Sequence, residues 1–328
     1  MSRVSIMSVA VAIGAIVWTT AVHAQAPAWQ PGRGVEIVAG SAAGGAQDRT
    51  ARSLQRLLTE KSIVATPVSV LNKPGGGGAV AMTYLNQHAG DAHYISVGSP
   101  TLLTNQINLK GAGARTDYTP IAILFSEYIV LAVRPESGIT SGRDLAQRLK
   151  ANPGSVSFGV ATARGGMQHV AVGLVARAAG ADVKKLRVVV FNSGGESITS
   201  TLGGHIDVVA TAAANAAPHV EAGRLRVLGV AAPRRLPAPF ASAPTWREQG
   251  IDAIASNWRS VLGPRGLTEA QLGYWDAAFA RLSAASEWQD EMRKNHWTGE
   301  HLKSREAAAF MDAQFSELKS VLGELLGP

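Results

Sequence analysis

The chain has 328 residues, no cysteine and a formal net charge of +7. The absence of cysteine excludes disulfides, a thiol nucleophile, zinc–thiolate sites and iron–sulfur clusters. Lysine and arginine are spread along the sequence without a basic run, so we do not expect a nucleic acid as a partner.

The first 24 residues have the pattern of a cleaved secretory signal peptide. Arg3 gives a positive start, Ile6 to Val17 is apolar, and Val22-His23-Ala24 places small residues at the cleavage site. A membrane anchor is the alternative, but the apolar stretch is shorter than the ~20 residues that a spanning helix needs. We therefore expect export to the periplasm and a mature chain that begins near Gln25.

The first third of the mature chain alternates between strands and helices. A helix is predicted from Asp48, with an apolar stripe from Ala51 to Leu58, and another ends near Leu85. Glycine-rich segments follow the first two strands, and the predicted strands are 35–39, 64–71 and 94–97. This alternation predicts an α/β fold with a largely parallel sheet.

A second set of elements begins in the apolar stretch 121–133, which Ser126-Glu127 interrupts. We predict helices at 141–149 and 167–176 and one that ends at Leu202, and strands at 156–160, 186–191, 206–210 and 225–230. A strand at 260–262 is predicted to return to the first set. The last helix has one apolar face, formed by Met311, Phe315, Leu318, Leu322 and Leu325.

These elements predict two lobes with a ligand cleft between them. The first lobe is expected to contain residues 25–125 and 256–328, and the second residues 126–255. Each lobe is expected to have a central, mostly parallel sheet flanked by helices. Such sheets bind ligands at the carboxyl ends of their strands.

Both lobes contain a pair of glycines between a strand and a helix, Gly44-Gly45 and Gly165-Gly166. Glycine lets the backbone approach a ligand, and the free N–H groups and macrodipole at a helix N-terminus attract anions. The two pairs could therefore hold a carboxylate from both sides. The alternative is that each pair forms an ordinary strand-to-helix turn.

Several side chains near these loops are candidate ligand contacts. Asp48 could bond a ligand amine, hydroxyl or water, or cap its helix. Arg164 could clamp a carboxylate or point into solvent, and His169 is expected to support the loop by hydrogen bonds. The other candidates are Ser41, Ala43, Ser99, Thr101, Thr162, Asn192 and Asn215, for which turn chemistry is the alternative.

The sequence contains none of the common catalytic motifs. G-x-S-x-G, H-E-x-x-H, G-x-x-x-x-G-K-[ST] and G-x-G-x-x-G are all absent, and the eight histidines are scattered. We therefore expect no catalytic residue, no bound metal and no cofactor. A hydrolase with an unrecognised site, or a scaffold without a ligand, remains the alternative to a binding protein.

The order of several short blocks resembles one receptor family across the mature chain. Ala43-Gly44-Gly45-Ala46-Gln47-Asp48 matches its first ligand loop, and Thr162 to His169 resembles the second. The remaining blocks are Asn72 to Gly78, Gly194-Gly195, Leu202 to Asp207, Pro218 to Leu225, Ala243 to Gly250, and Trp258 with Gly263-Pro264. The chain is similar to the Bug-type, TctC-like solute-binding receptors of the tripartite tricarboxylate transporter family.

This resemblance implies a periplasmic binding protein fold of type II-like organisation, with two lobes joined by crossing strands. It implies a small carboxylate ligand, such as a dicarboxylate, a tricarboxylate, an amino acid or an aromatic acid. A membrane permease or a sensor is the implied partner. No coiled coil is predicted, and we expect a monomer.

Departures from the family pattern lie close to the expected cleft. Gly40-Ser41-Ala42 stands where a proline is usual before the first loop, and Phe191-Asn192-Ser193 replaces a common tyrosine–lysine pair. Arg164 places a cation in a loop that is often uncharged. The identity of the ligand therefore does not follow from the resemblance.

Overall fold

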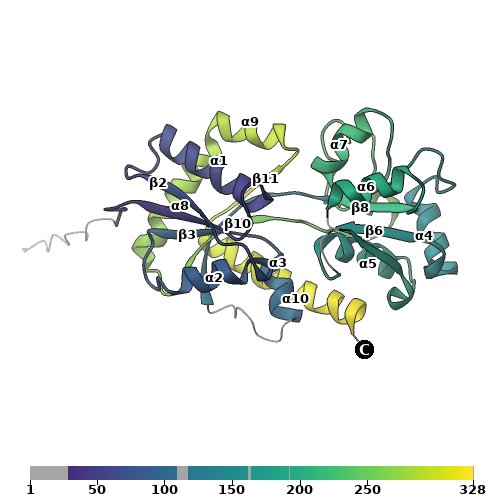
Figure 1. Ribbon diagram of the computed structural model, residues 1–328, viewed down its shortest axis with the longest axis horizontal. Coiled ribbons are helices and arrows are strands. Elements are labelled where there is room, and N and C mark those ends of the chain that lie inside the picture. The colour runs from purple at the N-terminus through teal and green to yellow at the C-terminus, as the bar shows by residue number, and fades with distance from the viewer. Residues whose placement is uncertain (1–28, 109–116, 162–163, 192, 328) are drawn as a thin grey trace, which may run out of the picture.

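The computed structural model describes residues 29–108, 117–161, 164–191 and 193–327. They form two sheets that lie side by side, each flanked by helices, so that the molecule has two lobes (Figure 1). The predicted α/β fold with two lobes is confirmed. The predicted signal peptide lies outside the described residues, and no helix within them is long and apolar enough to cross a membrane.

The first lobe is built on a six-stranded sheet of order β11-β4-β10-β3-β1-β2. Its strands are β1 (Val35–Ala39), β2 (Val68–Asn72), β3 (Tyr94–Gly98), β4 (Tyr118–Ser126), β10 (Arg259–Pro264) and β11 (Thr298–Leu302). β1 pairs in parallel with β2 and β3, and Ile37 lies opposite both Val70 and Ile95. β10 is antiparallel to β3 and β4, and β11 is antiparallel to β4.

Helices cover both faces of this sheet. They are α1 (Ala46–Glu60), α2 (Ala79–Asn86), α3 (Thr101–Asn108), α8 (Glu269–Ala284), α9 (Ser286–Lys294) and α10 (Ser304–Leu326). The predicted stripe from Ala51 to Leu58 is the buried face of α1, which packs in one core with Trp275 and Phe279 of α8. Burial of this stripe fixes the direction in which α1 leaves the first glycine loop.

The second lobe is built on a five-stranded sheet of order β7-β6-β8-β5-β9. Its strands are β5 (Ile129–Val133), β6 (Ser157–Ala161), β7 (Arg187–Phe191), β8 (Val208–Ala212) and β9 (Arg226–Val230). Its helices are α4 (Gly142–Ala151), α5 (Met167–Ala178), α6 (Gly194–Leu202) and α7 (Ala213–Glu221). β5 is antiparallel to β8 and β9, while β6 is parallel to β7 and β8.

The strands that run against the main direction belong mostly to the crossings between lobes. The expected parallel direction holds for β2, β1, β3 and β4 in the first sheet and for β7, β6, β8 and β9 in the second. β5 begins just after the chain enters the second lobe, and β10 begins just after it returns. Each crossing therefore inserts one reversed strand into a parallel sheet.

The two crossings lie side by side and form a hinge, which we define as residues 126–128 and 255–258. Tyr128 and Ser256 form an antiparallel bridge, and the Asn257 N–H donates to the Glu127 carbonyl at 2.8 Å. Trp258 is fully buried beside Phe310, with ring centroids 6.0 Å apart. Trp258 thus fills the hinge core.

The last helix, α10, contacts both lobes. It packs on β4 and α3 of the first lobe and on α5 of the second. Leu325 lies against Gly173, where a Cβ would come within 2.6 Å of Leu325 Cδ1, and Arg177 pairs with Glu324 at 3.2 Å. Met311, Leu318, Leu322 and Leu325 are buried as the predicted apolar face requires, while Phe315 is half-buried.

Candidate ligand-binding cleft

A cavity of about 330 Å³ opens between the lobes beside the hinge. This volume lies within the range of about 300–1,000 Å³ that is usual for small-molecule sites. It is lined by Gly40, Ser41, Ala46, Gln47, Gly77, Ser99 and Thr101 of the first lobe, by Gly166, Met167 and Gln168 of the second, and by Asn257 and Arg259. The cavity is therefore built from both lobes and from the returning crossing.

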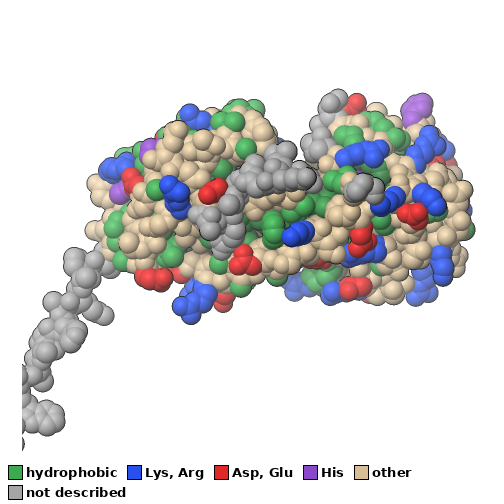
Figure 2. All heavy atoms as spheres, turned by 90° about the horizontal axis from the view of Figure 1, so that it is seen from below, with side chains coloured by type: hydrophobic (Ala, Val, Ile, Leu, Met, Phe, Trp, Pro, Cys, Tyr) green, Lys and Arg blue, Asp and Glu red, His purple; other side chains and the backbone are tan. Residues whose placement is uncertain are grey.

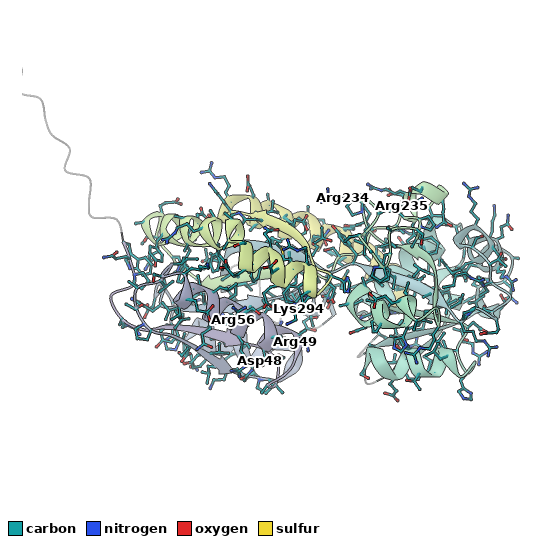
Figure 3. All side chains as sticks on the ribbon, turned by 90° about the horizontal axis from the view of Figure 1, so that it is seen from above. Asp48, Arg49, Arg56, Arg234, Arg235 and Lys294 are labelled. Atoms are coloured by element: carbon teal, nitrogen blue, oxygen red, sulfur yellow. The ribbon has the colours of Figure 1, made fainter. Side chains whose placement is uncertain are left out.

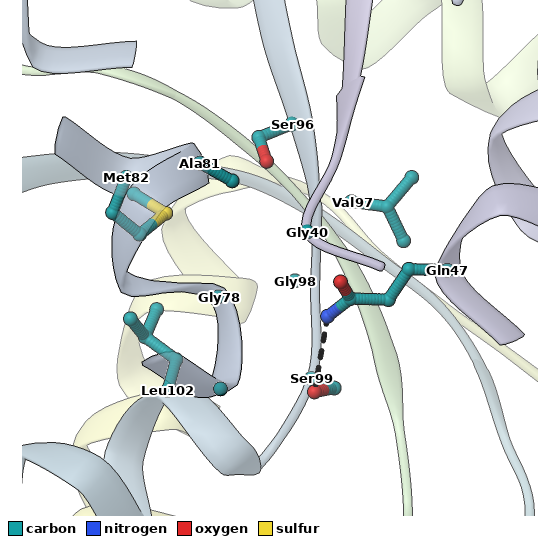
Figure 4. A pocket seen from close by; sticks show the side chains of 11 residues that line it. Gly40, Gln47, Gly78, Ala81, Met82, Ser96, Val97, Gly98, Ser99 and Leu102 are labelled. Carbon is teal, nitrogen blue, oxygen red and sulfur yellow. Dashed lines mark hydrogen bonds between the residues drawn. The ribbon is translucent and has the colours of Figure 1, made fainter. Parts of the chain in front are cut away.

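A smaller recess of the first lobe adjoins this cavity (Figure 4). Gly40, Gln47, Gly77 and Ser99 line both spaces, and the recess continues to apolar Met82 and Leu102. The Gln47 side-chain amide donates to the Ser99 hydroxyl at 3.3 Å. This bond ties the start of α1 to the end of β3.

The first glycine loop presents the start of α1 to the cavity. Gly44 has a φ of +78°, in the left-handed region that favours glycine, and Gly45 is the N-cap with φ −71° and ψ 168°. The first amides of a helix have no acceptor within the helix. Ala46 and Gln47, which line the cavity, can therefore offer their N–H groups to an anion.

Asp48 supports this loop from within. The helix begins at Ala46, two residues before the predicted start, so Asp48 is not its cap. Asp48 is 1% exposed, and its oxygens accept the Gly44 N–H at 2.8 Å, the Asn72 amide at 2.8 Å and Arg52 Nε at 3.0 Å. Burial raises the pKa of Asp48, but the bonds from Arg52, Asn72 and Gly44 outweigh it and lower the pKa to about 2.

The second glycine loop presents α5 in the same way. Gly165 has a φ of +81°, and Gly166 is the N-cap with φ −70° and ψ 166°. The buried His169 ring accepts the Gly165 N–H on Nδ1 at 2.9 Å. Burial, with a smaller contribution from the charge of Arg164, lowers the pKa of His169 to about 4, so the ring is a neutral acceptor near pH 7.

The structure brings only part of the predicted site to the cavity. Ser41, Ser99, Thr101 and Gly166 line it, while Gly44, Gly45 and Gly165 shape the adjoining loops and Ala43 is exposed within the first loop. Thr162 and Asn192 lie outside the described residues. The Arg164 side chain is exposed and donates to the Val188 carbonyl at 3.3 Å, and Asn215 donates to Thr211 at 3.5 Å in the first turn of α7.

Several lining residues were not predicted from the sequence. They are Gly40, Ala46, Gln47, Gly77, Met167, Gln168, Asn257 and Arg259. Gly77 belongs to the glycine-rich turn after β2, where its φ of +62° and the Asn105 amide hold the turn toward the cavity. Arg259 gave no local signal, because the predicted returning strand begins only at Ser260.

The cleft offers several polar donors. Backbone N–H groups of two helix starts, hydroxyls of Ser41, Ser99 and Thr101, and the Arg259 guanidinium line the same space. Among the described residues no group of three or more metal-ligating side chains could hold a metal ion. Donors of this kind bind an anion by hydrogen bonds and charge.

The chain is similar to known proteins in sequence and in fold. The sequence profile described as tripartite tricarboxylate transporter family receptor matches residues 50–325. A relative from Cupriavidus necator, described as "UPF0065 protein in gbd 5'region", is 27% identical over 331 residues, covering 99% of this chain and 96% of the relative.

Two solved structures show the same fold. A TctC solute binding protein from Polaromonas, without ligand, has a TM-score of 0.78 at 22% identity and covers 90% of this chain and 99% of its own. An R. palustris protein with adipate has a TM-score of 0.74 at 22% identity, with coverages of 90% and 98%. At these identities the likeness concerns the fold.

Proposed function

The chain belongs to the tripartite tricarboxylate transporter receptor family, and we propose that it captures a small organic carboxylate between its two lobes. Its family and fold are those of solute-binding receptors. Family membership alone gives neither the class of ligand nor the place where the ligand is captured.

One observation carries the proposal: two helix starts from different lobes open onto one cavity. Gly45 and Gly166 cap α1 and α5 without a side-chain hydrogen bond, so neither cap provides an acceptor for the first amides. An anion between them would accept hydrogen bonds from both lobes and interact with both macrodipoles. The solved R. palustris structure contains adipate, which is a small organic carboxylate.

Capture would work by closure of the lobes about the hinge. A carboxylate that bridges α1 and α5 gains all its contacts only when the lobes are close, so the ligand shifts the population toward the closed form. We further propose that the exported receptor acts in the periplasm as a monomer and delivers its ligand to a membrane permease or sensor.

The test is a binding screen with matched uncharged ligands. Calorimetry and thermal-shift measurements would compare aliphatic and aromatic acids with their primary amides, which keep the shape and lose the charge. We expect at least one acid to bind and to raise the melting temperature, because a ligand of the folded state stabilises it. The corresponding amide should bind at least tenfold more weakly.

Two outcomes of the binding screen would contradict carboxylate capture. If no acid binds, or if amides and acids bind equally, the carboxylate proposal is wrong. Turnover of an ester or amide in the same screen would instead support a hydrolase. Small-angle scattering with saturating acid tests closure separately, and an unchanged radius of gyration would contradict it.

A further inference from the structure

Arg259 is a buried cation at the floor of the cleft. It is the first residue of β10, its side chain is 6% exposed, and it lines the cavity together with Asn257. Burial of a charge is unfavourable unless the charge is paired and hydrogen-bonded. The partners of Arg259 therefore show how much of its binding capacity is already used.

The hydrogen bonds of Arg259 within the described residues all come from one nitrogen. Nη1 donates to the Asn257 carbonyl at 3.1 Å, to Asn257 Oδ1 at 3.0 Å and to the Trp258 carbonyl at 3.1 Å. Nη2 is 3.9 Å from Glu127 Oε2, beyond the usual hydrogen-bond distance. Some buried side-chain atoms in the described residues have no hydrogen-bond partner. Nε and Nη2 of Arg259 do not belong to this group.

Glu127 compensates the charge of Arg259 without saturating it. Glu127 lies on the outgoing crossing, its side chain is 12% exposed, and it also accepts the Asn257 amide at 3.3 Å. Burial raises the pKa of Glu127 although Arg259 and Arg49 act to lower it, and burial likewise lowers the pKa of Arg259. The pair is thus incompletely stabilised by its surroundings.

A second arginine adds positive charge to the surroundings of Arg259 and Glu127. Arg49 is close enough to act on both Glu127 and Arg259, and its Nη1 donates to the Gly44 carbonyl at 2.9 Å. Figure 3 shows Arg49 at the end of the first lobe that faces the second. Two guanidinium groups and one carboxylate leave one positive charge (2 − 1) beside the start of α1, which itself favours an anion.

We propose that Arg259 is the specificity-determining residue of the cleft, where it binds a second carboxylate of the ligand and selects dicarboxylates over monocarboxylates of equal length. This inference rests on the proposed function, in which the first carboxylate bridges the helix starts. The planar edge formed by Nε and Nη2 matches the two oxygens of a carboxylate. A monocarboxylate would leave that edge without a ligand partner.

Glu127 has a defined part in this selection. It competes with the second carboxylate for Arg259 and repels it, so its charge lowers the affinity for dianions. Replacement of Glu127 by glutamine keeps the side-chain shape and an acceptor for Asn257. Glu127→Gln is therefore expected to raise dicarboxylate affinity by about tenfold or more, because two carboxylates within ~10 Å repel each other strongly at an effective ε near 20.

The experiment compares acids of equal carbon number. Calorimetry at pH 7.5, well above the pKa of carboxyl groups, would measure Kd for succinate and butyrate, adipate and hexanoate, and phthalate and benzoate. For a pair that binds, Arg259→Gln is expected to weaken the dicarboxylate about 10- to 100-fold, as loss of a charged hydrogen bond predicts, and the monocarboxylate less than threefold. Arg281→Gln, which removes an exposed charge from α8, controls for net charge and should leave both unchanged.

The double variant Glu127→Gln/Arg259→Gln removes both charges of the pair, so that neither is left buried without its partner, and it serves if the single variant misfolds. It should show a wild-type melting profile and the same loss of dicarboxylate preference. If it keeps the wild-type ratio of affinities, or if Arg259→Gln weakens both members of a pair equally, Arg259 does not select the second charge. If wild type binds only monocarboxylates, this inference fails while the proposed function stands; if it binds no acid, the proposed function itself fails.

Discussion

The two glycine loops share one backbone geometry but are supported by different chemistry. Gly44 and Gly165 have φ values of +78° and +81°, and the following glycines are N-caps with nearly equal angles. In each loop the first glycine donates its N–H to a side chain four residues later. That side chain is an ionised Asp48 in the first lobe and a neutral His169 in the second.

The two different acceptors, Asp48 and His169, show what each glycine loop requires. The backbone needs a buried acceptor at one position, and a carboxylate or an imidazole nitrogen can supply it. A carboxylate needs further donors, which Asn72 and Arg52 provide, whereas the histidine needs none for its charge. Within the part of the chain that the structure describes, Asp48 therefore accepts bonds from three groups, whereas His169 accepts the bond of the Gly165 N–H.

The two lobes carry a similar mixture of charged side chains on one face of the molecule. On the face seen in Figure 2, basic and acidic side chains are interspersed over both lobes. The distinction between the lobes therefore lies at the cleft and not on this face.

The largest expected effect is the loss of the first support. Asp48→Ala would leave the Gly44 N–H without its acceptor, remove one of the two acceptors of the Asn72 amide and break the pair with Arg52. It should lower the free energy of unfolding by about 4 kcal/mol. Urea denaturation would measure this change.

Asp144 offers a matched control for Asp48. It likewise accepts a backbone N–H from four residues before, that of Thr140 at 2.9 Å, and an arginine four residues later, Arg148 at 2.8 Å. Asp144 is 26% exposed, so water can replace its bonds, and Asp144→Ala should cost about 1 kcal/mol. Equal losses of stability for Asp48→Ala and Asp144→Ala would show that the buried network of Asp48 has no special role.

The second-largest expected effect is a pH dependence of stability that differs between the two loops. The pKa of His169 is about 4 in the folded chain and about 6.5 in the unfolded chain, so the unfolded chain binds more protons between these values. Its contribution is complete above pH 6.5 and is lost as the pH falls to 4, by at most about 3 kcal/mol. Asp48, with a folded pKa of about 2, loses its contribution only below about pH 3.9.

The measurement for this pH dependence is urea denaturation at pH 7.5 and 4.5, with wild type and His169→Asn. The reference variant is needed because burial also lowers the pKa of His219 and His301. The charge of Arg164 acts on the His169 ring and disfavours its protonation. If both proteins lose the same stability between the two pH values, His169 does not provide the pH dependence.

The sequence reveals the loops because their signals are local. A glycine pair between an apolar strand and an amphipathic stripe predicts a helix start, and the structure has one in each lobe. Asn257 and Arg259 gave no local signal, since their place at the cleft depends on a crossing that returns after the whole second lobe. Arg164 shows the converse, because its loop was predicted while two directions of its side chain, onto a ligand or into solvent, stayed open.

A third prediction compares two replacements of the second support. His169→Ala removes the acceptor of the Gly165 N–H and should cost about 2 kcal/mol, because a buried donor is left unsatisfied. His169→Asn places an amide oxygen at about the same distance along the side chain and should recover at least half of this loss. Chemical denaturation and calorimetry with a bound acid would follow stability and affinity together. Equal behaviour of the two variants would show that packing, and not the acceptor, supports the loop.

The smallest expected effect tests whether the two backbones are equivalent. Gly44→Ala and Gly165→Ala each place a Cβ at a left-handed φ, which costs about 1 kcal/mol for alanine. A Cβ on Gly44 would meet no atom within 4 Å, so backbone conformation alone sets its cost. Because the two φ values differ by only 3° (81 − 78), the losses should agree within about 0.5 kcal/mol in urea denaturation. A much larger loss at Gly165, which is buried whereas Gly44 is exposed, would mean that packing around the second loop adds to the cost of the backbone conformation.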